Sequence, residues 1–489
     1  VANSNYTISF TPAALVITRR PIAIAADAKS KTFGEPAPAL TYTTTSGSLA
    51  FDDAFTGELS RVPGETVAGS PYAILQNTLG LNVNYDLSYT GADLVITSAV
   101  AAATLTFTPN PQQYSDVVEF TATVANGYRG GVQAASTMTV RLGTNVMGTI
   151  TLFPSGSSLT GTLSAALHEP GTAQWAPGMY MASGELGPAD PNFSLAPPAS
   201  GMLTIVPEDA RTTYAGPIFA SATNKYDDDD DEDLRYRTAN VTLTTTIRDI
   251  TATADAAGDE SFGDIRNATV SFVNRDNADA IIATVPLGLV STPDTKTATA
   301  SYNWVVNLGT ADSKTLNVGV VVNGHYARNS ATENVVVEVL KPALDYIKGS
   351  GYLVLASSAG ALAGDAGSRN DFSFEVKHNT SGSSLDGSIS TTVRRAGRVY
   401  QVKGTTNRSL SVQPGATGGT GTYVGKASVR DITNSSNPVT IDANAILQIT
   451  VGDAGTSGAA DQIAITAWKS GGGLWFSSNW SGTGTAQQA

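Results

Sequence analysis

Short segments in which apolar and polar residues alternate recur along this 489-residue chain. Residues 118–124 read VEFTATV, and residues 22–26 read IAIAA. Such alternation places successive side chains on opposite faces of a strand, so that one face packs and the other meets water. The segments are separated by stretches rich in Gly, Pro and Asn, which form turns. The pattern therefore predicts an all-β chain with almost no helix.

One of these segments occurs twice. Residues 5–18 read NYTISFTPAALVIT and residues 84–97 read NYDLSYTGADLVIT, a period of 79 residues (84 − 5). The second copy closes a unit that starts near residue 19, whereas the first copy has no such unit before it. We therefore expect residues 1–18 to be the tail of a preceding repeat, in a longer protein that carries several such modules in series.

Length and strand spacing predict four modules after this tail. A single hydrophobic core stops growing beyond roughly 250–300 residues, so a chain of 489 residues is expected to contain several cores. We expect a tandem array of β-sandwich, immunoglobulin-like modules that forms an elongated rod. The predicted divisions are a β-module at 19–98, a sandwich at 99–207, a sandwich with an acidic hairpin loop at 208–342, and a sandwich with a Trp-rich end at 343–489.

The complete repeat carries several motifs in a fixed order. FGEPAPALTY at 33–42 is followed by FTGELSRVPGE at 55–65, SPYAI at 70–74 and the closing NYDLSYTGADLVIT. This order resembles the MBG domains of bacterial secreted surface proteins. It departs from them at Phe33, where that family usually has Tyr before the glycine. The resemblance implies a β-rich spacer or binding module and supplies no catalytic residue.

Two further resemblances concern the rest of the chain. TLTFTPNPQQYSDVVEFTATV at 104–124 is similar to the first two strands of bacterial immunoglobulin-like domains. IRDIT at 247–251, VRDITN at 429–434 and DQIAITAWKSGGGLWFSSNW at 461–480 together resemble the C-terminal portions of very large Bacteroidota cell-surface proteins exported by type IX secretion. That resemblance implies an extracellular, adhesin-like protein.

Composition narrows the classes of function. The 29 Lys and Arg against 42 Asp and Glu give a net charge of −13, which disfavours nucleic acid and anionic membranes as partners. The sequence contains no run of 18 apolar residues, so it predicts no membrane span within these residues. Cysteine is absent, which excludes thiol catalysis and Cys-ligated zinc. The three histidines, His168, His325 and His378, fall in three predicted modules. We therefore expect no enzyme activity and no required cofactor.

Two groups of acidic residues are candidate Ca²⁺ ligands, because Ca²⁺ prefers clustered hard oxygen atoms. The first is an unbroken run that lacks the spaced Asp-x-Asp pattern, which favours the alternative of a solvated hairpin tip: Asp227, Asp228, Asp229, Asp230, Asp231, Glu232 and Asp233. The second is a scatter that could cage Ca²⁺ between modules at a sandwich tip: Asp249, Asp255, Asp259, Asp264 and Asp276. Asp also caps turns by hydrogen bonding its own backbone, which is the alternative here.

Aromatic residues gather near the end of the sequence. Trp468, Trp475 and Trp480 are three of the five tryptophans in the chain and fall within 13 positions. Exposed rings would form a platform for glycans, whereas packing in the core or between modules is the alternative. The same residue types serve both purposes, so the sequence leaves the two open.

These observations predict a non-catalytic stalk or adhesin segment of a large protein at the bacterial cell surface. Its Thr-rich, weakly charged surface suits polar contacts with a glycan or with extracellular matrix. A self-assembling extracellular filament is the alternative, because edge strands offer backbone groups to neighbouring copies of the same protein.

Overall fold

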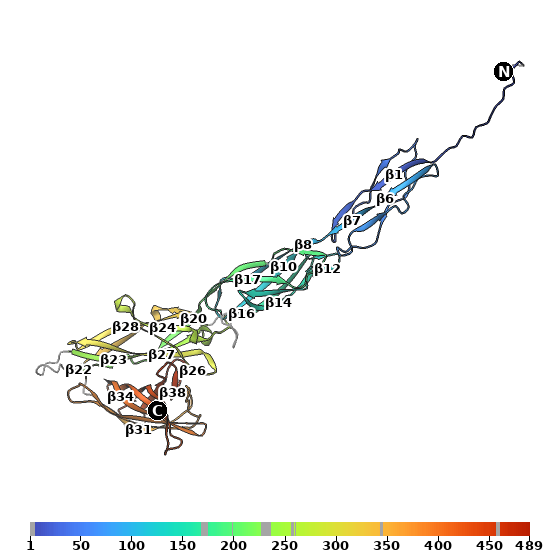
Figure 1. The fold of residues 1–489 in the computed structure, drawn as a ribbon. Coiled ribbons are helices and arrows are strands. Elements are labelled where there is room, and N and C mark those ends of the chain that lie inside the picture. Colours follow the sequence, from blue (N-terminus) through green and yellow to red (C-terminus); the bar gives the residue numbers. More distant parts are fainter. Residues whose placement is uncertain are drawn as a thin grey trace. The chain divides into compact units, whose positions relative to one another are not determined.

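The computed structural model describes residues 5–167, 175–197, 199–225, 236–255, 259, 261–342, 346–455 and 460–489. Within these residues the chain forms strands β1 to β38 and four short 3₁₀ turns, without an α-helix (Figure 1). This confirms the all-β prediction. The chain divides into two compact units. The first comprises Val1–Pro109, Glu119–Ala165 and Tyr180–Leu203, and the second comprises Asn110–Val118, Ala166–Met179 and Thr204–Ala489.

The first unit opens with two small sheets built from the complete repeat. Their strand orders are β3-β1-β6 and β2-β7-β5-β4. The alternation at residues 22–26 places Ile22 and Ile24 in a buried cluster with Leu79 and Tyr85. The strands are β1 (Arg20–Ala26), β2 (Lys29–Thr32), β3 (Tyr42–Ser46), β4 (Ser60–Arg61), β5 (Tyr72–Leu75), β6 (Tyr85–Thr90) and β7 (Ala92–Thr97).

Two five-stranded sheets follow, with the orders β15-β16-β10-β8-β18 and β14-β13-β17-β19-β9. In β10 the predicted alternation buries Phe120, Ala122 and Val124. The strands of these sheets are β8 (Ala99–Thr108), β9 (Gln112–Gln113), β10 (Val117–Ala125), β13 (Thr137–Leu142), β14 (Asn145–Thr151), β15 (Phe153–Ser155), β16 (Ser158–Ala166), β17 (Gly178–Leu186), β18 (Phe193–Leu195) and β19 (Ala199–Val206). A separate ribbon pairs β11 (Tyr128–Arg129) with β12 (Val132–Gln133).

The second unit contains an eleven-stranded sheet system. β20 pairs antiparallel with β23 and parallel with β29, and this parallel register sets Glu208 opposite Tyr326. The strands are β20 (Glu208–Tyr214), β21 (Phe219–Ser221), β22 (Thr223–Lys225), β23 (Tyr236–Asp249), β24 (Ala268–Asn274), β25 (Ala280–Val285), β26 (Gly288–Ser291), β27 (Asp294–Gly309), β28 (Ser313–Gly324), β29 (Tyr326–Asn329) and β30 (Val335–Leu340).

The C-terminal part of the second unit forms one eight-stranded sheet in chain order, β31 to β38. Every strand here pairs with the next one along the chain, and one continuous cluster of apolar side chains is buried. The strands are β31 (Tyr346–Val354), β32 (Arg369–His378), β33 (Leu385–Arg395), β34 (Arg398–Pro414), β35 (Gly419–Asp431), β36 (Val439–Asp453), β37 (Gln462–Trp468) and β38 (Leu474–Ser477).

The two sheet systems of the second unit share a hydrophobic cluster. Val290 of β26 packs with Ile446, Trp468 and Leu474 of the eight-stranded sheet. Their backbones also approach closely at Gly288, where an added Cβ would lie 2.1 Å from the carbonyl carbon of Gly472. The regions 208–340 and 346–489 are therefore packed together rather than joined only by a linker.

Candidate metal centre and ligand pocket

Three carboxylates from distant parts of the sequence meet in the second unit. Asp116, Glu208 and Asp259 each offer one ligand oxygen, and these oxygens lie within 4.8 Å of one another. Asp116 lies just before β10, Glu208 is the first residue of β20, and Asp259 lies between the 3₁₀ turns Ile250–Ala252 and Ile265–Asn267. Glu208 is fully buried.

Protein donors satisfy these oxygens only in part. One oxygen of Glu208 accepts a hydrogen bond of 2.7 Å from the backbone N–H of Asp209, and the other accepts a long one of 3.4 Å from Ser115 Oγ. Asp259 Oδ1 is buried and has no hydrogen-bond partner among the described residues. The neighbouring Asp249 differs, because Tyr326 Oη and Thr251 donate to it at 2.8 and 2.6–2.9 Å.

Burial and mutual repulsion make the charged forms of the cluster unfavourable. Burial, with the charges of Asp259 and Asp249, raises the pKa of Asp116 to about 7. Burial also raises the pKa of Glu208 to about 9, and the nearby carboxylates Asp259, Asp116 and Asp249 add to the shift. The pKa of Asp259 is raised as well, first by burial and then by Asp249. A cation among them would offset both effects.

Aromatic packing fixes the segment that carries Asp116. The Tyr114 ring is buried edge-on against His325 and Tyr326, with centroid distances of 4.7 and 5.6 Å. Tyr114 Oη also accepts a hydrogen bond of 3.0 Å from Asn267 Nδ2. An oxygen-only donor set held this way could hold a hard divalent cation such as Ca²⁺ or Mg²⁺.

The sequence-predicted acids have different places in the structure. Asp259 belongs to the cluster, and Asp249 lies close enough to raise the pKa values of its members. The other three lie outside the cluster: Asp255 pairs with Arg211, Asp264 pairs with Arg266 and also accepts a hydrogen bond from its backbone N–H, and Asp276 accepts one from the backbone N–H of Asn317. The acidic run, Asp227 to Asp233, lies outside the described residues.

Asp116 and Glu208 were missed by the sequence analysis. They are 92 positions apart (208 − 116), and neither lies in an acid-rich stretch. Their proximity arises from the β20–β29 register and from the packing of Tyr114. Among the histidines, His325 precedes β29 and His378 ends β32, in different sheets, while His168 is outside the described residues.

The tryptophans near the end of the sequence pack in two directions. Trp468 is buried in the cluster shared with Val290, and Trp480 packs half-buried against that same cluster. Trp475 is half-buried against the core of the eight-stranded sheet, and its Nε1 donates a hydrogen bond of 2.8 Å to Asp442. Lys469 Nζ lies 4.9 Å from the centre of the Trp475 ring. Of these three described tryptophans, Trp475 and Trp480 therefore retain exposed surface for a ligand.

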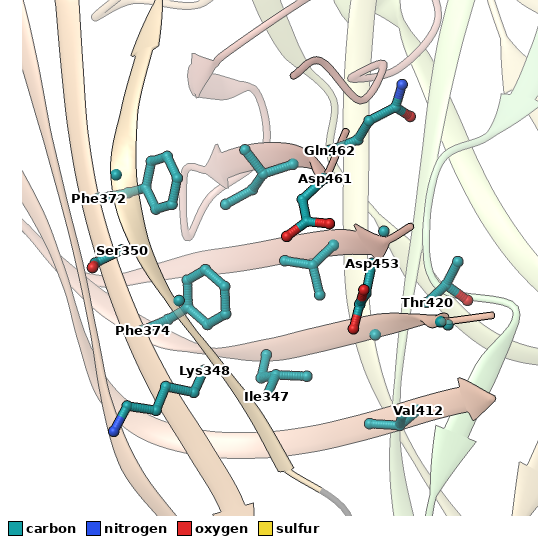
Figure 2. A pocket seen from close by; sticks show the side chains of 18 of the residues that line it. Ile347, Lys348, Ser350, Phe372, Phe374, Val412, Thr420, Asp453, Asp461 and Gln462 are labelled. Atoms are coloured by element: carbon teal, nitrogen blue, oxygen red, sulfur yellow. The ribbon is translucent and has the colours of Figure 1, made fainter. Parts of the chain in front are cut away.

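A pocket of about 690 Å³ lies on the eight-stranded sheet. Figure 2 shows Phe372 and Phe374 of β32 on one side, with Ile347 beside them and the carboxylates of Asp453 and Asp461 facing them. The two phenylalanine rings are nearly parallel, with centroids 6.1 Å apart. Each carboxylate already accepts a backbone hydrogen bond within the β36–β37 connection, at 2.6 and 3.1 Å. The pocket thus combines an apolar wall with an acidic rim.

The fold defines an all-β protein of several sheets, and comparisons with known proteins add one family match. Residues 22–95 match the model of the MBG domain (YGX type). No curated protein matches the chain. In the described part of the chain, no helix is long and apolar enough to cross a membrane.

Solved structures of other β-rich proteins resemble this chain only loosely. The fibronectin(III)-like modules of Clostridium thermocellum CbhA align at 11% identity over 48% of this chain and 93% of theirs, with a TM-score of 0.16. The Escherichia coli adhesin FdeC aligns at 10% identity over 78% and 97%, with a TM-score of 0.19. The Yersinia pseudotuberculosis adhesin InvE aligns at 14% identity over 53% and 66%, with a TM-score of 0.22. At these scores the alignments carry no argument about function.

Proposed function

We propose that this chain is a non-catalytic structural segment of a bacterial surface protein of the adhesin type, which carries its modules in series and projects them from the cell. The observation that carries the proposal is the joint within the first unit. β7 ends at Thr97 and β8 begins at Ala99, so a single residue separates the MBG-matching module from the sandwich that follows it.

Contacts on both sides of this joint fix its geometry. Phe33 packs edge-on against Phe193 with centroids 5.5 Å apart, and the backbone N–H of Val67 donates a hydrogen bond of 2.8 Å to Asn192 Oδ1. Arg129 Nη1 pairs with Glu35 at 2.5 Å. Phe33 and Glu35 flank Gly34 in the motif by which the repeat resembles MBG domains. This motif therefore supplies contacts that hold the two modules together at the joint. A segment that transmits position or force needs joints of this kind.

The finer form of the proposal concerns export and partners. The C-terminal motifs support export by type IX secretion in a Bacteroidota bacterium, and the Thr-rich surface supports polar contacts with a glycan or extracellular matrix. Binding to a glycan array would identify such a ligand. Loss of binding in Trp475→Ala with retention in Trp304→Ala would place it at the Trp-rich end.

A self-assembling filament remains the alternative because β31 is an edge strand of the eight-stranded sheet. Size-exclusion chromatography with light scattering, combined with small-angle X-ray scattering, separates the two. A stalk segment stays monomeric and elongated from micromolar to millimolar concentration. Polymers that grow with concentration would overturn the stalk proposal in favour of the filament.

A further inference from the structure

Residues 5–18 repeat residues 84–97 closely enough to define where they belong in a fold. The two segments are identical at nine of fourteen positions: Asn5, Tyr6, Ser9, Thr11, Ala13, Leu15, Val16, Ile17 and Thr18 match Asn84, Tyr85, Ser88, Thr90, Ala92, Leu94, Val95, Ile96 and Thr97. Two of the differences, Ile8 for Leu87 and Phe10 for Tyr89, keep a large apolar or aromatic side chain. The segment therefore carries the side chains that closing strands of this fold require.

The second copy shows what these side chains do. β6 pairs in parallel with β1, and β7 pairs in parallel with β2 and antiparallel with β5. Leu94 and Ile96 are buried between these partners. The hydroxyl of Tyr85 donates a hydrogen bond of 2.8 Å to Asp53 and accepts one of 2.8 Å from the backbone N–H of Ala50. Closing the module thus depends on strands that precede the segment along the chain.

In the first copy the same side chains face solvent. Tyr6 is 76% exposed where Tyr85 is 6% exposed, Leu15 is 87% where Leu94 is 0%, and Ile17 is 86% where Ile96 is 2%. Residues 6–18 form no strand and run as an extended trace (dark blue in Figure 1). Contiguous exposed apolar side chains of this kind mark a surface that is covered by a partner.

Residues 19–97 of the same chain are not that partner, because β6 and β7 already occupy the positions that residues 5–18 would take. We propose that residues 5–18 are the two closing strands of a second module of the MBG type. They dock against equivalents of β1, β2 and β5 that lie N-terminal to them in the same polypeptide, in the order seen in the complete repeat. This inference is independent of the proposed function, since a stalk and a filament would both contain such a module.

The test adds strands equivalent to β1, β2 and β5 in front of residues 5–18. A copy of residues 19–83 is placed directly before Asn5, which restores the 79-residue period (65 + 14). Amide hydrogen exchange is then followed by mass spectrometry in residues 5–18, with residues 84–97 as the internal reference. We expect exchange in residues 5–18 to slow by at least about a thousandfold on extension, because exchange from a folded strand requires opening of the module.

Two substitutions make the result specific. In the extended chain, Leu15 is equivalent to buried Leu94, so Leu15→Asp should abolish the protection of residues 5–18 from exchange. Val16→Asp occupies the position of Val95, which is 42% exposed, and should keep it. Unchanged exchange in residues 5–18 on extension, or equal effects of the two substitutions, would overturn the proposal. Protection that rises with concentration in the chain without the extension would also overturn it, because the partner would then be a second copy.

Discussion

Replacing Phe33 by alanine tests whether the joint in the first unit is held by side-chain packing. The ring is buried and meets Phe193 at an interplanar angle of 70°. Loss of a buried Phe costs about 3–5 kcal/mol, and an edge-to-face aromatic pair contributes about 0.5–1.5 kcal/mol beyond its buried area. We therefore expect Phe33→Ala to destabilise the first unit by about 3 kcal/mol or more, with a coupling energy to Phe193→Ala of about 1 kcal/mol in a double-mutant cycle.

The geometry of the joint can be measured directly because the chain contains no cysteine. Spin labels on Thr45→Cys and Ser157→Cys, both at exposed positions of the first unit, report the distance between its two modules. The distribution of this distance should be narrow in the parent chain and broad in Phe33→Ala. The control is Phe120→Ala, which removes a buried ring within one module and should lower stability without broadening the distribution.

An unchanged distribution in Phe33→Ala, or zero coupling to Phe193→Ala, would contradict the packed joint. Equal broadening in Phe120→Ala would show that general destabilisation, and not the joint, sets the width.

The other predictions concern the second unit. Gly288→Val should lower the free energy of unfolding of this unit by about 1–3 kcal/mol, because the added side chain overpacks the backbone of Gly472. It should also split a single urea transition, followed by tryptophan fluorescence, into two. One unchanged transition would contradict this prediction. Calorimetric titration with Ca²⁺ at pH 8 should release or absorb heat in the parent chain and in Asp255→Asn, but not in Glu208→Gln. Equal heats in the two variants would rule out the carboxylate cluster as the Ca²⁺ site. Ca²⁺ affinity should fall as the pH drops from 8 to 6, because the ligands must lose protons that the raised pKa values of Asp116 (about 7) and Glu208 (about 9) retain. Although burial opposes it, hydrogen bonds from Arg328 and Thr212 hold the pKa of Glu333 below its ordinary value. That depressed pKa adds stability above pH 4–5, and this stability is progressively lost as the pH falls. Glu333→Gln should therefore lower the free energy of unfolding by about 1–2 kcal/mol at pH 7 and by less at pH 3, measured by urea unfolding at both.

Alternation in the sequence was sufficient to predict strands and their buried faces. Residues 118–124 lie in β10 and residues 22–26 lie in β1, each with alternate side chains buried. Alternation has a period of two and carries no information about which strand lies next door. For that reason the single eight-stranded sheet and the Trp468–Val290 contact could not be predicted.

The carboxylate cluster shows the same limit for a site. The acid-rich stretch around Asp259 gave a signal because its members are close in sequence. Asp116 and Glu208 gave none, because a strand register and the packing of Tyr114 bring them together. A single carboxylate outside an acid-rich stretch can be recognised as a candidate ligand only when the structure shows that it is buried.

Two glycines allow a close approach at the contacts between sheets, next to the large side chains that are buried there. An added Cβ at Gly34, which has a φ of +76°, would lie 2.7 Å from Arg129 Cβ, and one at Gly288 would lie 2.1 Å from the backbone of Gly472. Both positions therefore allow an approach that any other residue would prevent. Each contact lies outside the main core of the sheets it joins, so a substitution there should change the geometry between sheets more than their folding. The strands thus encode each sheet, whereas close glycine contacts together with buried side chains such as Phe33 and Trp468 set neighbouring sheets within a unit against each other.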